Sequence, residues 1–218
     1  PKLIFCSITG YGQAGPYASR PGHDLNYLAI AGVSSYTGRV GQGPIPLGIQ
    51  VADVAGGSMH AVTGILAAVV ERNISGLGQS IDISMTDAAF ALNGMAAAGC
   101  LGGGVEPKPS EMLLNGGSFY DYYQTSDGRY ISVGSLEPQF MTMLCDAINK
   151  PELAKLGMSP KASVQQMLRE TLTDVFKANT FEYWCELFKD IEACVEPVLS
   201  VSEAANHPQI KHRNMVIN

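Results

Sequence analysis

Side chains that can exchange protons occur in three short segments of the 218-residue chain, each next to glycine or proline. The first segment, Arg20–Tyr27, bends at Pro21 and Gly22 and then presents His23 followed by Asp24. A neutral imidazole can take a proton near neutral pH, which makes His23 a candidate general acid/base. A histidine at such a turn is also often a helix cap or a structural hydrogen-bonding group. This segment by itself leaves both roles open.

The second segment, Val51–Met59, carries Asp53 followed by Gly56 and Gly57. A lone aspartate before a helix is usually an N-cap, which is the simpler interpretation of Asp53. The two glycines would leave backbone N–H groups uncovered at the positive end of a helix, where an anion or an oxyanion can bind. The spacing is not GxGxxG, so the segment does not indicate a dinucleotide site.

The third segment places Glu137 directly before Pro138. Proline is favoured at the first helical position, so this carboxylate is either a helix-terminal charge or a group with a chemical role. The remaining histidines have simpler interpretations: His60 on a helix face, His207 in a turn and His212 in an exposed C-terminal segment.

The five cysteines are scattered along the chain, with neither CxxC spacing nor paired histidines: Cys6, Cys100, Cys145, Cys185 and Cys194. A zinc site or a disulfide framework needs closer pairing. We therefore expect no metal, and we interpret the cysteines as free thiols that pack as small hydrophobic residues. Free thiols are typical of reducing compartments, which predicts a cytoplasmic protein, or a peroxisomal or mitochondrial one in a eukaryote.

The residues up to 100 alternate strand-like and helix-like patterns, which is the α/β arrangement. The apolar run Leu3–Ile8 is typical of a strand buried on both faces of a parallel sheet. Apolar residues spaced by three and four over Met59–Val70 predict an amphipathic helix that ends near Gly76. Alternation predicts a strand over residues 81–85, and an Ala-rich helix is expected from Thr86 or Asp87 to about Gly99.

A smaller α+β module is expected further along the chain. Two strand-like runs, Phe119–Thr125 and Arg129–Gly134, flank an Asp-Gly pair, which is a strong hairpin signal. A helix should begin at Pro138 and place Phe140, Met143, Leu144 and Ile148 on one face. Two more helices are expected over Ser163–Lys177 and Phe181–Lys189, the second capped by Thr180.

Composition bounds the function classes. The net charge of −6 and pI of about 5.1 disfavour binding to nucleic acid, whose affinity comes from neutralising phosphates. The longest apolar run, Ala61–Val70, falls short of the ~20 residues of a membrane span, and no signal peptide is visible. Gly102–Gly104 and Pro107–Pro109 predict a linker. We divide the chain into a large-domain part (1–100), a linker (101–118), a small α+β domain (119–198) and a segment returning toward the large domain (199–218).

Several of these segments resemble the family III CoA-transferase superfamily, in the family's order and along nearly the whole chain. The matching segments are Gly10–Pro16, Arg20–Tyr27, Ala52–Met59, Gly76–Gln79 with the following strand, Asn115–Asp121, Trp184–Cys185 and Ala193–Val198. Gly22–Tyr27 and Glu137–Phe140 resemble the α-methylacyl-CoA racemase branch. The resemblance implies that residues 1–100 belong to a Rossmann-like large domain. It also implies that the chain, which begins at Pro1, is a piece lacking an N-terminal half whose basic residues hold the CoA nucleotide.

The resemblance implies racemisation of 2-methylacyl-CoA thioesters, which requires two acid/base groups on opposite sides of one carbon. It matches those roles to His23 and Asp53, with Glu137 as a supporting group delivered from a partner subunit of an interlocked dimer. Such a pair works in an apolar, partly desolvated cleft. The candidates for contact with the CoA thioester are Gly22, Asp24, Asn26, Tyr27, Gly56 and Gly57. CoA is then part of the substrate, and no separate cofactor is expected.

The same scaffold carries CoA-transferases, in which the aspartate matching Asp53 is a nucleophile that forms an acyl anhydride. Asp53 therefore does not separate the two activities. His23 and the Glu137–Phe140 segment favour the racemase. A chain without the nucleotide-binding half is expected to bind CoA weakly.

Overall fold

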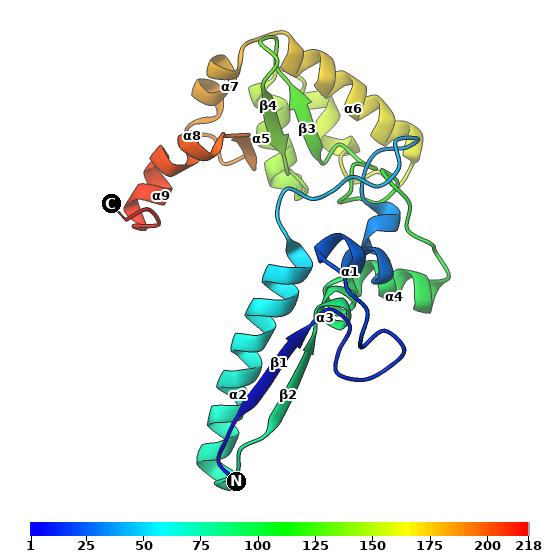
Figure 1. Ribbon diagram of the computed structural model, residues 1–218. Coiled ribbons are helices and arrows are strands. Elements are labelled where there is room, and N and C mark those ends of the chain that lie inside the picture. Colours follow the sequence, from blue (N-terminus) through cyan, green and yellow to red (C-terminus); the bar gives the residue numbers. More distant parts are fainter. Residues whose placement is uncertain (218) are drawn as a thin grey trace. The chain divides into compact units, whose positions relative to one another are not determined.

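The computed structural model describes residues 1–217, which form two compact units (Figure 1). The first unit is Pro1–Ser110 and the second begins at Glu111, so the boundary lies within the segment predicted as a linker. The first residues of that segment are helical, because the last helix of the first unit continues to Gly103. Residues from 199 onward are grouped with the second unit.

The first unit contains two strands, four α-helices and two other helical segments in its described residues. They are β1 (Phe5–Thr9), α1 (Asp24–Ile30), the 3₁₀ segment η1 (Val33–Tyr36), the π-helical segment η2 (Ala52–Met59), α2 (His60–Ser75), β2 (Ser80–Ser84), α3 (Met85–Leu92) and α4 (Gly94–Gly103).

The strands β1 and β2 pair in parallel, with Phe5 opposite Ser80 and Thr9 opposite Ser84. This pairing confirms the parallel sheet expected from the apolar run. The prediction that the first strand is buried on both faces was wrong, since Phe5 is 57% exposed and Ile8 50% exposed. The described sheet has two strands, and its neighbours α2 and η2 do not enclose both faces.

The helix that follows Asp53 is longer than the sequence indicated, because η2 runs directly into α2. It ends as expected at Gly76, whose φ of +78° is a left-handed conformation that glycine adopts without strain. Ala52–Ser75 has 24 residues and a mean hydropathy of 1.4 in its most apolar window, enough to cross a membrane by length and composition alone. Core helices of globular proteins share this length and composition, and this helix packs on β1, β2 and α3 (Figure 1).

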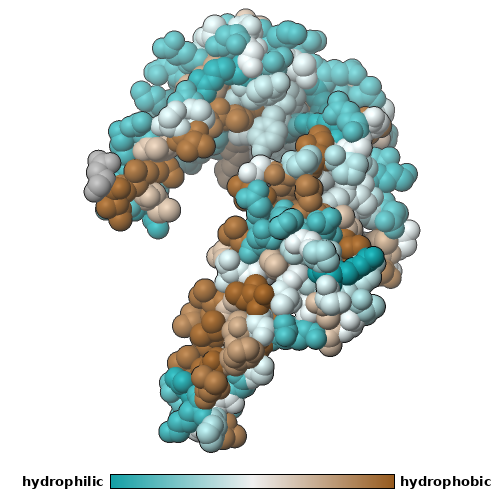
Figure 2. Space-filling model, viewed as in Figure 1, coloured by the Kyte–Doolittle hydropathy of each residue, from teal (hydrophilic) through white to brown (hydrophobic). Residues whose placement is uncertain are grey.

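Part of this helix presents apolar side chains to the outside. Val62, Leu66 and Val70, spaced by four along α2, are each more than half exposed. Figure 2 shows the hydrophobic surface that gathers over this helix. The described part of the first unit has a small buried core, formed by Tyr27, Leu28, Ala31, Ala52 and Ala89.

The predicted Ala-rich helix is divided into α3 and α4, which meet at Asn93. The first of them begins at Met85, one or two residues earlier than expected, because Ser84 is the N-cap and its hydroxyl accepts the N–H of Asp87 at 3.1 Å. Strand β2 therefore ends where α3 begins.

The second unit combines a three-stranded antiparallel sheet with helices. Its elements are β3 (Asp121–Gln124), β4 (Tyr130–Val133), α5 (Pro138–Ala147), the 3₁₀ segment η3 (Pro151–Leu156), α6 (Ala162–Lys177), α7 (Phe181–Phe188), β5 (Val195–Pro197), α8 (Val201–Asn206) and α9 (Pro208–His212). The strand order is β3-β4-β5, with the hairpin β3–β4 at one side as the Asp-Gly pair predicted.

The hairpin turn is tied to the helix layer. Gly128 has a φ of +81°, and its N–H donates to the carbonyl of Thr125 at 3.0 Å. The Asp127 carboxylate accepts the Thr125 hydroxyl at 2.5 Å and the backbone N–H of Phe181, the first residue of α7, at 3.1 Å. These hydrogen bonds and the charge of Arg129 lower the pKa of Asp127.

The core of the second unit lies between the sheet and helices α5, α6 and α7. Phe119, Leu144, Leu168, Leu172 and Phe176 are fully buried there. The Trp184 ring lies 4.8 Å from that of Phe176, and its indole N–H donates to the Phe176 carbonyl at 2.8 Å. This core is larger than that of the first unit.

The helix expected at Pro138 is confirmed, and its buried face agrees with the prediction in part. Met141, Leu144 and Cys145 face the core, whereas Met143 is 40% exposed. Leu144 and Ile148 of the predicted face are buried as expected, and Met141 and Cys145 lie beside them in place of Met143.

Candidate active site

The turn that carries His23 is held by its own neighbours in the sequence. His23 is exposed and is the N-cap of α1, and its backbone N–H donates to Asn26 Oδ1 at 3.0 Å. The Tyr27 hydroxyl donates to the carbonyl of Gly22. Two of the predicted substrate-contact residues, Asn26 and Tyr27, thus have structural hydrogen bonds within the turn.

Asp53 lies in the first turn of η2 and is half-buried. The segment is π-helical over eight residues, a rare geometry that often occurs at functional sites. The Ser58 hydroxyl donates to the Asp53 carbonyl at 3.3 Å, five residues away, as the wider π turn allows. The Asp53 side chain is a first-turn residue of the helix and is not its N-cap, which is Val51.

A buried carboxylate connects the two segments. Asp24 Oδ1 accepts the backbone N–H of Ala52 at 2.6 Å and that of Asp53 at 3.2 Å. Asp24 follows His23 in the chain, so the two candidate acid/base residues are linked through immediate neighbours although 30 residues separate them. The structure therefore brings together the His23 and Asp53 segments.

The charge of Asp53 also acts on Tyr27. Burial raises the pKa of the Tyr27 phenol, and the negative charges of Asp53 and then Tyr11 raise it further. The Tyr11 ring packs edge-on against that of Tyr27, with centroids 5.2 Å apart. The phenol therefore stays protonated at physiological pH and keeps its hydrogen bond to the Gly22 carbonyl.

Gly56 and Gly57 are buried within η2, where they allow close packing against other elements. A Cβ on Gly56 would lie 3.3 Å from the Met85 carbonyl oxygen. A Cβ on Gly57 would lie 3.1 Å from the Met85 side chain and 3.4 Å from Ile8. The structure thus gives both glycines a packing role that the predicted anion site did not include, and their contact with substrate stays a prediction.

Glu137 belongs to the second unit and is exposed. It is the N-cap of α5 but makes no capping hydrogen bond with its side chain, so the carboxylate is not used as a helix cap. Its charge lies near Cys194, where burial is the main cause that raises the thiol pKa and Glu137 is the second. The segment Glu137–Phe140 thus presents the Glu137 carboxylate on the surface of the second unit.

His60 and the cysteines stay outside the candidate active site. His60 Nδ1 lies 2.6 Å from the carbonyl of Ala55. The five cysteines are free thiols, and burial raises the pKa of Cys145 to about 11. Residues 1–217 contain no group of three or more His, Cys, Asp or Glu side chains arranged to hold a metal ion.

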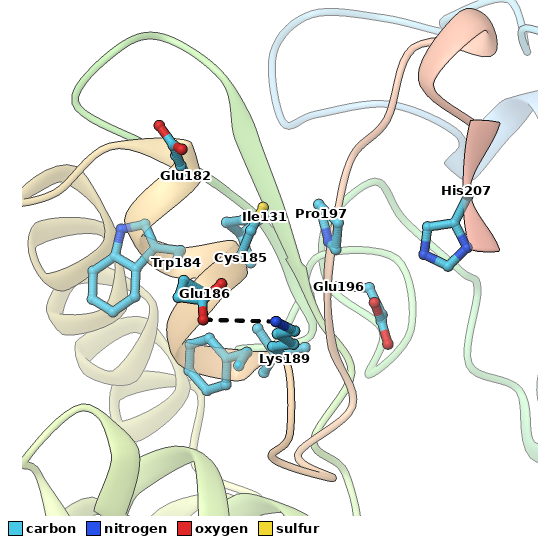
Figure 3. Close-up of a pocket in the computed structure, with 11 residues that line it drawn as sticks. Ile131, Glu182, Trp184, Cys185, Glu186, Lys189, Glu196, Pro197 and His207 are labelled. Carbon is cyan, nitrogen blue, oxygen red and sulfur yellow. Dashed lines mark ion pairs between the residues drawn. The ribbon is translucent and has the colours of Figure 1, made fainter. Parts of the chain in front are cut away.

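A pocket of about 490 Å³ lies within the second unit, between α7, the sheet and His207 (Figure 3). Its lining includes Trp184 and Cys185 and an ion pair between Glu186 and Lys189 at 3.8 Å. None of the predicted acid/base or thioester-binding residues lines it.

Known racemases and CoA-transferases are similar in sequence to this chain. The chain is 36% identical to the alpha-methylacyl-CoA racemase of Mus musculus over 98% of the chain and 56% of that protein. It is 28% identical to the human succinyl-CoA:glutarate CoA-transferase over 100% of the chain and 50% of that protein. The chain thus spans about half the length of the curated relatives it matches.

Solved structures share the fold. A CAIB/BAIF family protein from Brucella suis superposes with a TM-score of 0.76 at 29% identity, covering 100% of this chain and 58% of that one. The Rv3272 protein of Mycobacterium tuberculosis gives a TM-score of 0.78 at 22% identity, over 99% of this chain and 58% of that one. The model of CoA-transferase family III matches residues 1–218, and the chain belongs to that family.

Proposed function

We propose that this chain carries the acid/base residues of an enzyme that racemises 2-methylacyl-CoA thioesters. The observation that carries the proposal is the pair of hydrogen bonds from Ala52 and Asp53 to Asp24, which joins the turn of His23 to the helix of Asp53. Racemisation requires two proton carriers on opposite faces of the α-carbon, and two separate segments can supply them. The racemases among the relatives, at 35–36% identity, support this choice of reaction.

In the proposed reaction, neutral His23 takes the α-proton from one face of the thioester, and a protonated Asp53 returns a proton to the other face. The reverse assignment serves the opposite enantiomer. The intermediate carries its negative charge on the thioester oxygen, so hydrogen-bond donors near this oxygen stabilise it. We assign contact with the thioester part to the segments containing Gly22–Tyr27 and Gly56–Gly57.

Glu137 is proposed to support the site from the second unit of a partner subunit, in a homodimer. CoA is part of the substrate, so the proposal includes no separate cofactor. We place the reaction in branched acyl-CoA, and therefore lipid, metabolism in the cytoplasm or an equally reducing organelle.

The second candidate is a CoA-transferase, which the transferases among the relatives favour. In that reaction Asp53 attacks the acyl-CoA carbonyl, CoA leaves as a thiolate, and an aspartyl anhydride forms. CoA attack on the activated carboxylate gives an aspartyl thioester and releases the first acid. The carboxylate of a second acid attacks the Asp53 thioester, which releases the CoA thiolate and forms a second anhydride. The thiolate then attacks the acyl carbonyl of this anhydride, which gives the new acyl-CoA and frees the Asp53 carboxylate. His23 has no necessary role in this sequence of steps.

Proton NMR in D₂O separates the two reactions. The protein at its full natural length is incubated with one enantiomer of a 2-methylacyl-CoA, with and without a dicarboxylate acceptor such as succinate. A racemase removes the α-proton signal without an acceptor and yields the other enantiomer. Transfer of CoA to the dicarboxylate with the α-proton retained would reject the racemase and support the transferase.

A further inference from the structure

Asp24 lies on the inward face of α1. Together with Tyr27, Leu28 and Ala31 it occupies positions i, i+3, i+4 and i+7, which share one side of a helix. Those three partners belong to the buried core of the first unit, with Ala52 and Ala89. Asp24 is 9% exposed, whereas its neighbours His23 and Leu25 are exposed. The carboxylate is thus directed away from the surface on which His23 lies.

The Asp24 carboxylate accepts hydrogen bonds from backbone N–H groups that have no other partner within their helix. The first N–H groups of a helix have no carbonyl partner within that helix. Ala52 is fully buried, so its N–H would be costly to leave unpaired. The Asp24 contacts at 2.6 Å to Ala52 and 3.2 Å to Asp53 satisfy two of these groups with a charged acceptor from 28 and 29 residues away.

We infer that Asp24 is a positioning residue: its buried carboxylate holds the first turn of η2 so that Asp53 faces the same reacting carbon as His23. The inference rests on the proposed function and changes the role predicted for Asp24 from a thioester contact to a clamp between two segments. The Asp24 carboxylate acts on the backbone of Asp53, and in this role the Asp24 side chain does not touch the substrate. Since a misplacement of about 1 Å can cost about 100-fold in rate, its loss should affect catalysis more than binding.

The test compares Asp24→Asn with Asp82→Asn as a matched control. Asp82 is an exposed aspartate of the same unit that also accepts a distant backbone N–H, that of Gln13 at 2.9 Å. Asparagine keeps the shape of the side chain but makes a weaker, uncharged acceptor. Steady-state racemisation and amide hydrogen exchange are measured on both variants and on the wild-type protein.

For Asp24→Asn we expect kcat to fall about 10- to 100-fold, with KM for the acyl-CoA changed by less than about 2-fold. Exchange of the Ala52 and Asp53 amides should become about 10-fold faster or more, because their acceptor is weakened. The Asp82→Asn control should leave both kcat and those two amides at wild-type values.

A KM increase above about 10-fold with unchanged exchange at Ala52 and Asp53 would overturn the clamp and return Asp24 to the substrate contacts. Unchanged kcat and exchange would also overturn it. If Asp24→Asn does not fold, amide hydrogen exchange in the wild-type protein tests the inference instead. Rapid exchange of the Ala52 and Asp53 amides in the wild-type protein would contradict a clamp. A wild-type protein without racemase activity but with the expected exchange pattern in Asp24→Asn would reject the proposed function and leave the clamp intact.

Discussion

Arg129 and Glu203 form a two-point ion pair, in which two guanidinium nitrogens each lie 2.8 Å from a carboxylate oxygen. The pair joins the residue before β4 to the first turn of α8. Glu203 also accepts the backbone N–H and the hydroxyl of Ser200, each at 2.8 Å, in a capping box. The Ser200 N–H, then Arg129 and the Ser200 hydroxyl lower the pKa of Glu203 from 4.5 to about 2.

This depressed pKa predicts an acid-dependent contribution to stability. Because Glu203 binds its proton more weakly in the folded state, its contribution is present above pH 4.5 and is lost as the pH falls toward 2. In thermal unfolding, the stability advantage of the wild-type protein over Glu203→Gln should therefore shrink across that interval. Both proteins should show the same pH dependence above about pH 6, where Glu203 is ionised in both states.

The origin of the shift is tested by NMR titration of the Glu203 carboxyl group. In Arg129→Met the pKa should rise but remain below 4.5, because the Ser200 N–H, the larger cause, is retained. A wild-type titration centred at 4.5 would contradict the hydrogen-bonded geometry.

Gly10 is expected to be intolerant of a side chain. A Cβ at this position would lie 2.4 Å from the Tyr27 ring, which is buried and bonded through its hydroxyl to Gly22. Gly10→Ala should displace that ring and destabilise the first unit by about 1–3 kcal/mol. Urea unfolding of the protein measures the change.

Gly99→Ala is the matched control for Gly10→Ala. Gly99 lies inside α4, and a Cβ there would meet nothing within 4 Å. The substitution should stabilise the helix by about 0.5–1 kcal/mol. Equal effects of the two alanines would show that the Tyr27 ring is not held where the structure has it.

The parts of the fold that depend on local signals could be predicted from the sequence. The Asp127-Gly128 turn, the Thr180 cap of α7 and the Gly76 terminus of α2 were all correct, because each signal acts within a few residues. The Ser200–Glu203 capping box is another local signal, S-x-x-E, which the sequence predictions did not include.

Features that depend on distant neighbours were harder to predict. The run Leu3–Ile8 is apolar enough for a doubly buried strand, but its exposure is decided by what packs on the sheet. The helix after Ser80–Ser84 begins at Met85 because Ser84 caps it, although Thr86 and Asp87 are equally good caps by residue type.

In the candidate site, the sequence indicated the reacting groups and not their support. His23 and Asp53 stand out because residues of these types can exchange protons. Asp24 was predicted to contact the substrate because its segment, Gly22–Tyr27, resembles the thioester-binding segment of the family. Its burial beside Ala52, 28 residues away, follows from tertiary packing.

The proposed role of Glu137 predicts complementation between two inactive variants. We mix His23→Ala protomers with Glu137→Gln protomers under conditions that exchange subunits. If Glu137 acts across the dimer, each mixed dimer has one intact site and one site with both defects. Statistical mixing then restores about one quarter of the wild-type activity.

The activity of the mixture is compared with that of each variant alone at the same total concentration. Glu137 acting within its own chain would leave every site of the mixture with one defect, so no activity would return. Sedimentation of the mixture as monomers would likewise contradict an interlocked dimer.

The last prediction separates a proton carrier from a nucleophile at residue 53. If Asp53 moves protons, Asp53→Asn should abolish racemisation, and the wild-type protein should form no covalent acyl adduct. His23→Ala should suppress α-proton exchange from one enantiomer more than from the other, because each face of the carbon has its own proton carrier. Hydroxylamine trapping followed by mass spectrometry, with Asp82→Asn as the control carboxylate, measures adduct formation. An adduct on Asp53, CoA transfer between two acids, no deuterium at the α-carbon and partial tolerance of His23→Ala would together identify a transferase.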